Sequence, residues 1–151
     1  MPVQPIPDGF HTLTPYLVCK NAGDAIAWYV KALGAKELYR MPGPGGEVMH
    51  AELQVGTSRL MLAEENLQRG AKSPATLGGS PVSTFIYTDD VDALFAKTTG
   101  EGAKTKMPPT DMFWGDRFAA IVDPSGHEWQ MATHKEDVAP DEMMKRMQAQ
   151  V

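Results

Sequence analysis

The polar side chains with the clearest chemical potential lie on two segments that alternate like β-strands. His50 and Glu52 are two residues apart, so a strand would point both side chains to one face. Glu128, Gln130 and His134 share one parity if a second strand stays regular that far. If the two segments converge, the two histidines and the two glutamates would make a nitrogen and oxygen ligand set for a divalent metal. The alternative is that each is a solvated residue on a polar strand face.

The segment Met107–Arg117 has the most unusual composition in the chain. It holds two prolines and an apolar run that includes Phe113 and Trp114. We interpret it as a loop that either forms a lid over a binding site or anchors itself on the core or on a second subunit. The Arg117 guanidinium would then either clamp an anionic ligand or form an internal salt bridge with Asp116 or another acid.

Signatures of other enzyme classes do not occur in the sequence. It contains no Gly-x-Ser-x-Gly motif and no glycine motif for phosphates or dinucleotides. The single cysteine, Cys19, falls on the strand face that we expect to pack against a helix. A buried, inert thiol is therefore predicted there.

Two halves of the sequence repeat the same order of strand and helix signals. The apolar positions of the first helical stretch recur 69 residues later, where Ala22, Ala25 and Ile26 become Val91, Leu94 and Phe95. Each half continues with two further strands separated by a turn. The pattern therefore predicts a duplicated βαβββ unit. Aligning the halves places Arg117 at the position of His50, which favours the same sheet face for both side chains.

The repeat sets the expected domain organisation. We predict a single domain over residues 1–151 that consists of two modules, a linker and a terminal helix. The predicted boundaries are about 10–69 for module 1, about 70–81 for the linker, about 82–137 for module 2 and about 140–150 for the helix. Met143, Met144 and Met147 form an apolar stripe on that helix, which suits packing on a module or a second subunit.

The composition is that of an ordinary globular domain. The 151 residues are 42% hydrophobic and 22% charged, which is enough apolar content for a packed core. The formal net charge of -5 leaves no basic surplus to neutralise phosphates, so no nucleic-acid partner is expected. There is no run of about 18 apolar residues and no signal-peptide pattern in the first ten residues. We therefore expect a cytoplasmic protein with no membrane partner.

Several motifs carry a resemblance to a known superfamily. They are residues 14–18, 25–29 and 33–35 in the first half, and residues 111–117 and 123–129 in the second half. The sequence resembles the vicinal oxygen chelate superfamily, which includes glyoxalase I, bleomycin- and fosfomycin-resistance proteins and extradiol dioxygenases, and within it the PhnB-like proteins of bacteria. The resemblance implies an α+β fold in which two βαβββ modules form a curled, incomplete barrel sheet with outer helices and an inner ligand cavity.

The resemblance also implies positions for a metal. Metal-dependent members place one His or Glu ligand on each of four strands, two from each module. The matching positions here are Thr14, Ser83, Gln130 and one residue within Met61–Ala63. Hydroxyl and amide groups bind divalent transition metals poorly, so we expect no metal at the standard positions and no cofactor. The alternative is a divalent metal at a displaced site made by His50, Glu52, Glu128 and His134.

Two classes of function remain. The first, favoured by the missing standard ligands, is a homodimeric protein that binds a small molecule in the cavity. The candidate ligand-binding residues are Tyr16, His50, Glu52, Phe85, Tyr87, Phe113, Trp114, Arg117 and Gln130, with Trp129 as a further aromatic candidate. The second class is a lyase, isomerase or dioxygenase that uses a metal in the displaced site.

Overall fold

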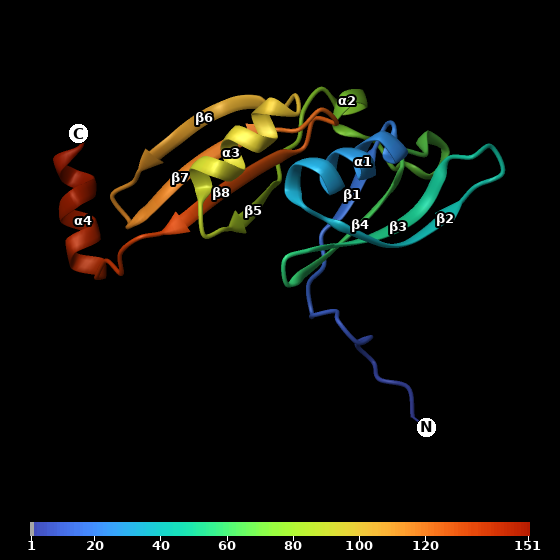
Figure 1. The fold of residues 1–151 in the computed structure, drawn as a ribbon, viewed down its shortest axis with the longest axis horizontal. Helices are drawn as coiled ribbons and strands as arrows, with labels where there is room; N and C mark the ends of the chain where they lie inside the picture. The colour runs from blue at the N-terminus through green and yellow to red at the C-terminus, as the bar shows by residue number, and fades with distance from the viewer. Residues whose placement is uncertain (1) are drawn as a thin grey trace. The chain divides into compact units, whose positions relative to one another are not determined.

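The computed structural model describes residues 2–151 and separates the chain into two compact units, Met1–Ser80 and Pro81–Val151. We call them unit 1 and unit 2. Each unit contains one four-stranded mixed sheet and a helix that follows its first strand (Figure 1). The chain order within each is strand, helix and three strands, so the predicted α+β class and the duplicated βαβββ unit are confirmed. The strands form two separate sheets and not one closed barrel.

Unit 1 is built from a parallel pair extended by two antiparallel strands. Its elements are β1 (Tyr16–Cys19), α1 (Ala22–Leu33), β2 (Lys36–Pro42), β3 (Val48–Val55) and β4 (Ser58–Glu64). The strand order is β1-β4-β3-β2, with β1 parallel to β4 and the other neighbours antiparallel. Because β4 lies between β1 and β3, only long side chains from the outer strand can reach across to β3.

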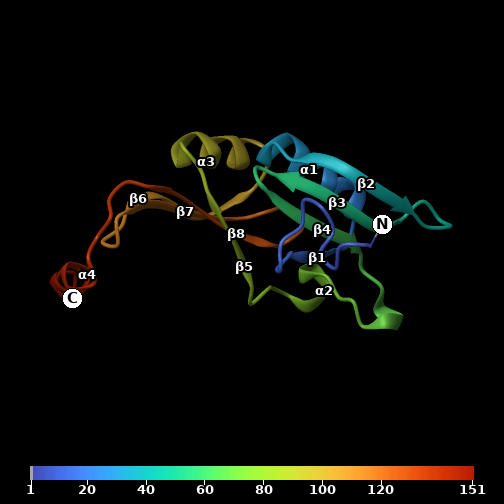
Figure 2. The same cartoon turned by 90° about the horizontal axis from the view of Figure 1, so that it is seen from below.

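One face of the unit 1 sheet packs against α1, which lies across it in both views (Figures 1 and 2). Cys19 and Leu62 on the strands and Tyr29 on the helix are almost fully buried in this core. The prediction of a buried Cys19 thiol is thereby confirmed. The helix ends at Gly34, which adopts a left-handed conformation (φ 67°) that glycine reaches without steric cost.

The small-residue stretch at 70–81 is folded and is more than a connecting linker. It contains the short helix α2 (Pro74–Leu77), which follows the 3-10 turn η1 (Leu67–Arg69). Ser73 caps α2 and is fully buried, and its backbone N–H and hydroxyl both donate to the Glu65 carboxylate. Hydrogen bonds from Thr76 and Ser73 hold the pKa of Glu65 below its usual range. The stretch is thus fastened to the end of β4.

Unit 2 repeats this arrangement. Its elements are β5 (Ser83–Tyr87), α3 (Val91–Gly100), β6 (Lys104–Asp111), β7 (Asp116–Val122), β8 (Glu128–His134) and α4 (Pro140–Ala149). The strand order is β5-β8-β7-β6, with β5 parallel to β8. The helix α3 lies across one face of this sheet (Figures 1 and 2). Ala119, Ile121 and Met131 on β7 and β8 are buried.

The predicted loop Met107–Arg117 is mostly strand, which corrects the sequence interpretation. β6 continues through Pro108 and Pro109 to Asp111, and β7 begins at Asp116, so only residues 112–115 form the turn. Prolines are tolerated because β6 is an edge strand with a neighbour on one side only. The N–H groups that the prolines lack are therefore not needed to pair with a second strand. The pairing of β6 with β7 is irregular between Met107 and Thr110, at the two prolines.

Trp129 is also placed differently from the prediction. It lies on the helix-facing side of β8 and is only 2% exposed, and its indole N–H donates to the Asp123 carboxylate at 2.8 Å. The strand alternation that brings Gln130 to the other face puts Trp129 in the core. It is therefore part of the hydrophobic core and not of a ligand-binding surface.

The terminal helix α4 stands clear of the unit 2 sheet in both views (Figures 1 and 2). It has no buried residue, and Met144 and Met147 are exposed. Arg146 on α4 pairs with Glu136 in the preceding segment. Among residues 2–151, no helix combines the length and the apolar run that crossing a bilayer requires.

Candidate functional site

Each sheet has a face that its own helix does not cover, and we call this the open face of the unit. Strand register defines a row of side chains across each open face. In unit 1 the row is Tyr16, Met61, Glu52 and Tyr39, and in unit 2 it is Phe85, Gln130, Ala120 and Met107. Most of the candidate ligand-binding residues from the sequence lie on these two faces.

On the open face of unit 1, three predicted residues form a hydrogen-bonded chain. The Tyr16 hydroxyl lies 2.9 Å from His50 Nδ1, and His50 Nε2 lies 3.2 Å from a carboxylate oxygen of Glu52. Tyr16 is half exposed, whereas about a quarter of the His50 and Glu52 side chains is exposed. Partial burial raises the pKa of the Tyr16 phenol. A phenol, an imidazole and a carboxylate in sequence can transfer a proton.

The open face of unit 2 carries a cluster of aromatic rings. The Phe85 ring lies 4.9 Å from Tyr87 and 6.0 Å from Phe118, and Trp114 lies 5.9 Å from Phe118 and 5.1 Å from Phe113. Phe85 and Tyr87 are 41% and 66% exposed. We call these five residues the aromatic cluster. Sequence analysis found four of them and missed Phe118, although the alternation of β7 places it on the same face.

A buried carboxylate supports the aromatic cluster. Asp116 is 4% exposed and accepts hydrogen bonds from the indole N–H of Trp114 at 3.1 Å and the hydroxyl of Tyr87 at 3.4 Å. Its other oxygen lies 2.8 Å from His134 Nδ1. From the sequence, Asp116 was expected as a partner for Arg117. Its actual role is to orient two rings of the cluster and one histidine.

His134 bonds to carboxylates through both ring nitrogens. In addition to Asp116, Asp137 lies 2.7 Å from Nε2. The hydrogen bonds to Asp137 and Asp116 raise the pKa of His134. The backbone N–H groups of Lys135 and Glu136 donate to the carbonyl of Gly115, so the segment after β8 is tied to the turn that carries Trp114. A side chain at Gly115 would collide with the Glu136 carbonyl, which explains the glycine.

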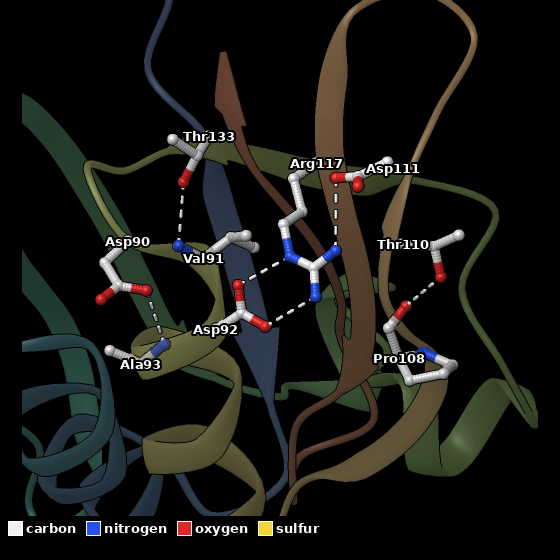
Figure 3. A network of polar contacts seen from close by, with 9 residues as sticks. All are labelled: Asp90, Val91, Asp92, Ala93, Pro108, Thr110, Asp111, Arg117 and Thr133. Carbon is white, nitrogen blue, oxygen red and sulfur yellow. Dashed lines mark hydrogen bonds and ion pairs between the residues drawn. The ribbon is translucent and has the colours of Figure 1, made fainter. Parts of the chain in front are cut away.

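The prediction that Arg117 shares a sheet face with His50 is wrong. Figure 3 shows Arg117 reaching from β7 to Asp92 near the start of α3 and to Asp111 on β6. Two guanidinium nitrogens donate to Asp92 at 2.7 and 2.9 Å and a third to Asp111 at 3.2 Å. These bonds raise the pKa of Arg117 and lower that of Asp92. The alternative prediction of an internal salt bridge is correct, and the partner acids are Asp92 and Asp111 instead of Asp116.

The register gives the physical reason for the error. Ala51 pairs with Leu62 and Leu62 with Leu17, whereas Ala119 pairs with Met131 and Met131 with Ile86. The residue of unit 2 that corresponds to His50 is therefore Phe118. Arg117 is one position away, and a shift of one residue moves a side chain to the opposite face.

At the other end of β8, Glu128 belongs to a polar group. Lys106 donates to its carboxylate at 2.6 Å. This bond, together with smaller contributions from Ser83 and Gln130, lowers the pKa of Glu128. Glu128 and His134 occupy the first and last positions of β8, about 20 Å apart for six residues of extended chain. A single metal ion therefore cannot bind both, and the displaced set of four ligands is not brought together.

The standard metal positions do not fit a transition metal either. Gln130 pairs with Phe85 as Met61 pairs with Tyr16, so Met61 is the remaining position within Met61–Ala63. The donors are then the hydroxyls of Thr14 and Ser83, the Gln130 amide and the Met61 thioether, with no imidazole, carboxylate or thiolate. Within residues 2–151, no three His, Cys, Asp or Glu side chains are grouped so that they could hold a metal ion.

Comparisons with known proteins give the family. An uncharacterized protein of Mycobacterium bovis is 40% identical over 141 residues, which covers 91% of this chain and 93% of that protein. The crystal structure of TioX from Micromonospora sp. ML1 is 26% identical, covers 82% of this chain and 98% of its own, and has a TM-score of 0.65. A PhnB protein from Bacillus cereus, 16% identical over 82% of this chain and 99% of its own, shares the fold with a TM-score of 0.64.

The family model of the Glyoxalase/Bleomycin resistance protein/Dioxygenase superfamily matches residues 9–131. This region includes the open faces of both units apart from the last residues of β8, from Ala132 to His134, and the segment that follows them. The chain therefore belongs to the Glyoxalase/Bleomycin resistance protein/Dioxygenase superfamily.

Proposed function

We propose that the protein binds a planar small molecule, neutral or positively charged, on the aromatic cluster of unit 2, and that it does so without a metal at the standard positions of the family. The observation that carries the proposal is the cluster itself. Large aromatic side chains are normally buried, yet Phe85 and Tyr87 remain exposed beside each other. Stacking on such rings stabilises a planar ligand by dispersion and by removing apolar surface from water.

The charges around the cluster favour a neutral or cationic ligand. Asp116 lies beneath the rings, and Asp137 lies beside His134. Of the three strong cations on the sheet, Lys106 pairs with Glu128 and Arg117 bonds to acids on the helix-facing side. The third, Lys104, lies on the edge strand at the end of the sheet away from Tyr87 and Asp116. Aromatic faces themselves attract cations through their quadrupole.

Tryptophan fluorescence tests the binding proposal. Two probes share one ring system and differ in charge: naphthalen-2-ylmethylammonium and 2-naphthoate. We expect the ammonium compound to quench Trp114 and bind more tightly than the carboxylate. Phe85→Ala should weaken binding of the ammonium compound about fivefold, because the loss of one stacking ring is worth about 1 kcal/mol. Tyr16→Phe in unit 1 is the matched control and should leave the titration unchanged. The proposal would be refuted if 2-naphthoate bound more tightly than the ammonium compound. It would also be refuted if Phe85→Ala bound the ammonium compound as tightly as the wild type.

The metal part of the proposal has its own test. Protein purified without an affinity tag from metal-supplemented medium should contain less than about 0.1 equivalent of Zn, Ni, Mn or Fe, because the donors at the standard positions are weak. Elemental analysis that finds one equivalent would support the alternative function, a metal-dependent lyase, isomerase or dioxygenase.

We also propose that the chain forms a homodimer. Met144 and Met147 on α4 are exposed, and a second copy would bury this apolar stripe. Light scattering at micromolar concentration should report twice the 16.5 kDa mass of the chain. A monomeric mass would exclude the homodimer.

A further inference from the structure

On the open face of unit 1, Tyr16, His50 and Glu52 are hydrogen-bonded in an order that suits proton transfer. It runs from a half-exposed hydroxyl, through an imidazole, to a carboxylate on the same strand as the imidazole. Tyr16 reaches His50 across β4, which separates their strands. The contact therefore depends on the folded sheet and cannot form locally in the sequence.

The carboxylate determines which nitrogen of His50 carries the proton. An ionised carboxylate only accepts hydrogen bonds, so Glu52 requires a proton on Nε2 of the neutral ring. Nδ1 then has a free lone pair, and the Tyr16 hydroxyl donates to it. This is the arrangement in which a base is oriented by an acid and accepts a proton from a hydroxyl group.

We propose that Tyr16, His50 and Glu52 form a proton relay that ionises an acidic hydroxyl group, a phenol or an enol, of a small molecule bound on the open face of unit 1. The ligand hydroxyl gives its proton to the Tyr16 oxygen as the Tyr16 proton moves to His50 Nδ1. The ligand becomes a phenolate or enolate, Tyr16 remains a neutral phenol, and His50 becomes an imidazolium ion. Glu52 stabilises that cation at Nε2. No oxidant, reductant or further reactant is needed.

The chemistry of the relay selects the ligand class. An aliphatic alcohol is too weak an acid to give a proton to an imidazole, and a carboxylic acid has already lost its proton at neutral pH. Phenols and enols fall between these limits. Tyr39 and Met41 beside His50 are both exposed and supply a flat, apolar contact for such a ligand.

Within residues 2–151, Glu52 is the charged side chain that bonds to His50. The titratable side chains on this face, from the strands that surround His50, are Tyr16 on β1, Lys36 and Tyr39 on β2, Glu52 on β3 and Arg59 on β4. Lys36 pairs with Gln54, at the far end of β3, and the Arg59 guanidinium lies over the ring of Phe10. Partial burial raises the pKa of Tyr16, so its hydroxyl keeps its proton when no ligand is bound.

The probe 4-nitrophenol tests the relay because its phenolate ion absorbs visible light. It is added to the full-length protein at a pH where the free compound is mostly un-ionised. We expect the apparent pKa of the bound phenol to fall by about one unit, which is a tenfold shift of its ionisation. Tyr16→Phe and Glu52→Gln should each abolish the shift. Lys36→Gln, at the far end of the same face, and Phe85→Ala, in unit 2, should both retain it.

Three results would overturn the proposal: binding of 4-nitrophenol without ionisation, no binding, or a shift that survives in both relay variants. A second measurement needs no ligand. Nitrogen-15 NMR of the unliganded protein should show His50 protonated at Nε2 and bare at Nδ1, with that preference weakened in Glu52→Gln. A ring protonated at Nδ1 would also overturn the relay. The inference concerns unit 1 and does not rest on the function proposed for unit 2.

Discussion

The two units share one backbone plan, but their open faces carry different chemistry. The position of His50 in unit 1 is held by Phe118 in unit 2, and the row partners Tyr16 and Glu52 correspond to Phe85 and Ala120. One face is a chain of hydrogen bonds, and the other is a cluster of rings above a buried acid.

The helix-facing sides have not diverged in the same way. Leu17 corresponds to Ile86, Leu53 to Ile121 and Leu62 to Met131, and all these positions are apolar. They must fill a core beneath a helix, where volume and polarity are constrained. An open face carries no such constraint. The comparison shows that the two units keep similar cores while their open faces carry different side chains.

The largest expected effect is on stability, and it differs between the carboxylates of the two open faces, Asp116 and Glu52. Asp116→Ala should lower the free energy of unfolding by about 3 kcal/mol, because it removes the buried carboxylate that is the hydrogen-bond partner of Trp114, Tyr87 and His134. Glu52→Ala is the matched change in unit 1 and should cost less than about 1 kcal/mol, because Glu52 is partly exposed and has one partner in the relay. Urea denaturation measures both. Equal losses would remove this difference between the units.

Trp114→Ala should have the next largest effect, and it sharpens the account of the aromatic cluster. The variant loses two ring contacts and one hydrogen bond to Asp116, so we expect a loss of about 2 kcal/mol in stability. Affinity for naphthalen-2-ylmethylammonium should fall about tenfold. Thermal melting measures the change in stability, and isothermal titration calorimetry measures the affinity. A stability loss of about 3 to 5 kcal/mol with unchanged affinity would show that Trp114 only anchors its turn.

Part of this comparison was accessible from the sequence. Strand alternation predicted the core position of Cys19, and the repeat predicted the βαβββ order of both units. Alternation also put His50 and Glu52 on one face. The contact of Tyr16 with His50 was not predictable, because it depends on β4 lying between β1 and β3, a pairing between segments distant in sequence.

The errors have equally specific causes. Arg117 was misplaced by a single residue of alignment, which reverses the face of a strand. Trp129 was grouped with the exposed aromatic residues by type, although its parity opposes that of Gln130. The prolines of β6 indicated a loop because the sequence does not show which strands are at the edge of a sheet.

Arg117→Ala should have a smaller effect and no effect on binding. Its loss removes the ion pairs with Asp92 and Asp111, which are partly solvent-exposed and therefore contribute little. We expect a slightly lower Tm and the same affinities for both naphthalene probes as in the wild type. Selective weakening of 2-naphthoate would restore the hypothesis that Arg117 clamps an anion.

The smallest expected effect is a pH dependence in unit 2. The pKa of His134 is raised in the folded protein, so its protonation stabilises the fold. That stabilisation is complete below the pKa of an unfolded histidine, about 6.5, and is lost as the pH rises through the folded pKa. His134→Gln should reduce the decline in stability across this range. A decline identical to that of the wild type would assign the effect to other groups.

The division of chemistry between the two open faces is tested most directly by NMR. Naphthalen-2-ylmethylammonium is titrated into nitrogen-15-labelled protein, and amide shifts are followed residue by residue. The account predicts perturbations centred on Phe85, Tyr87 and Phe118, with Tyr16, His50 and Glu52 unchanged. Perturbations centred on the unit 1 residues, or none on either face, would contradict it.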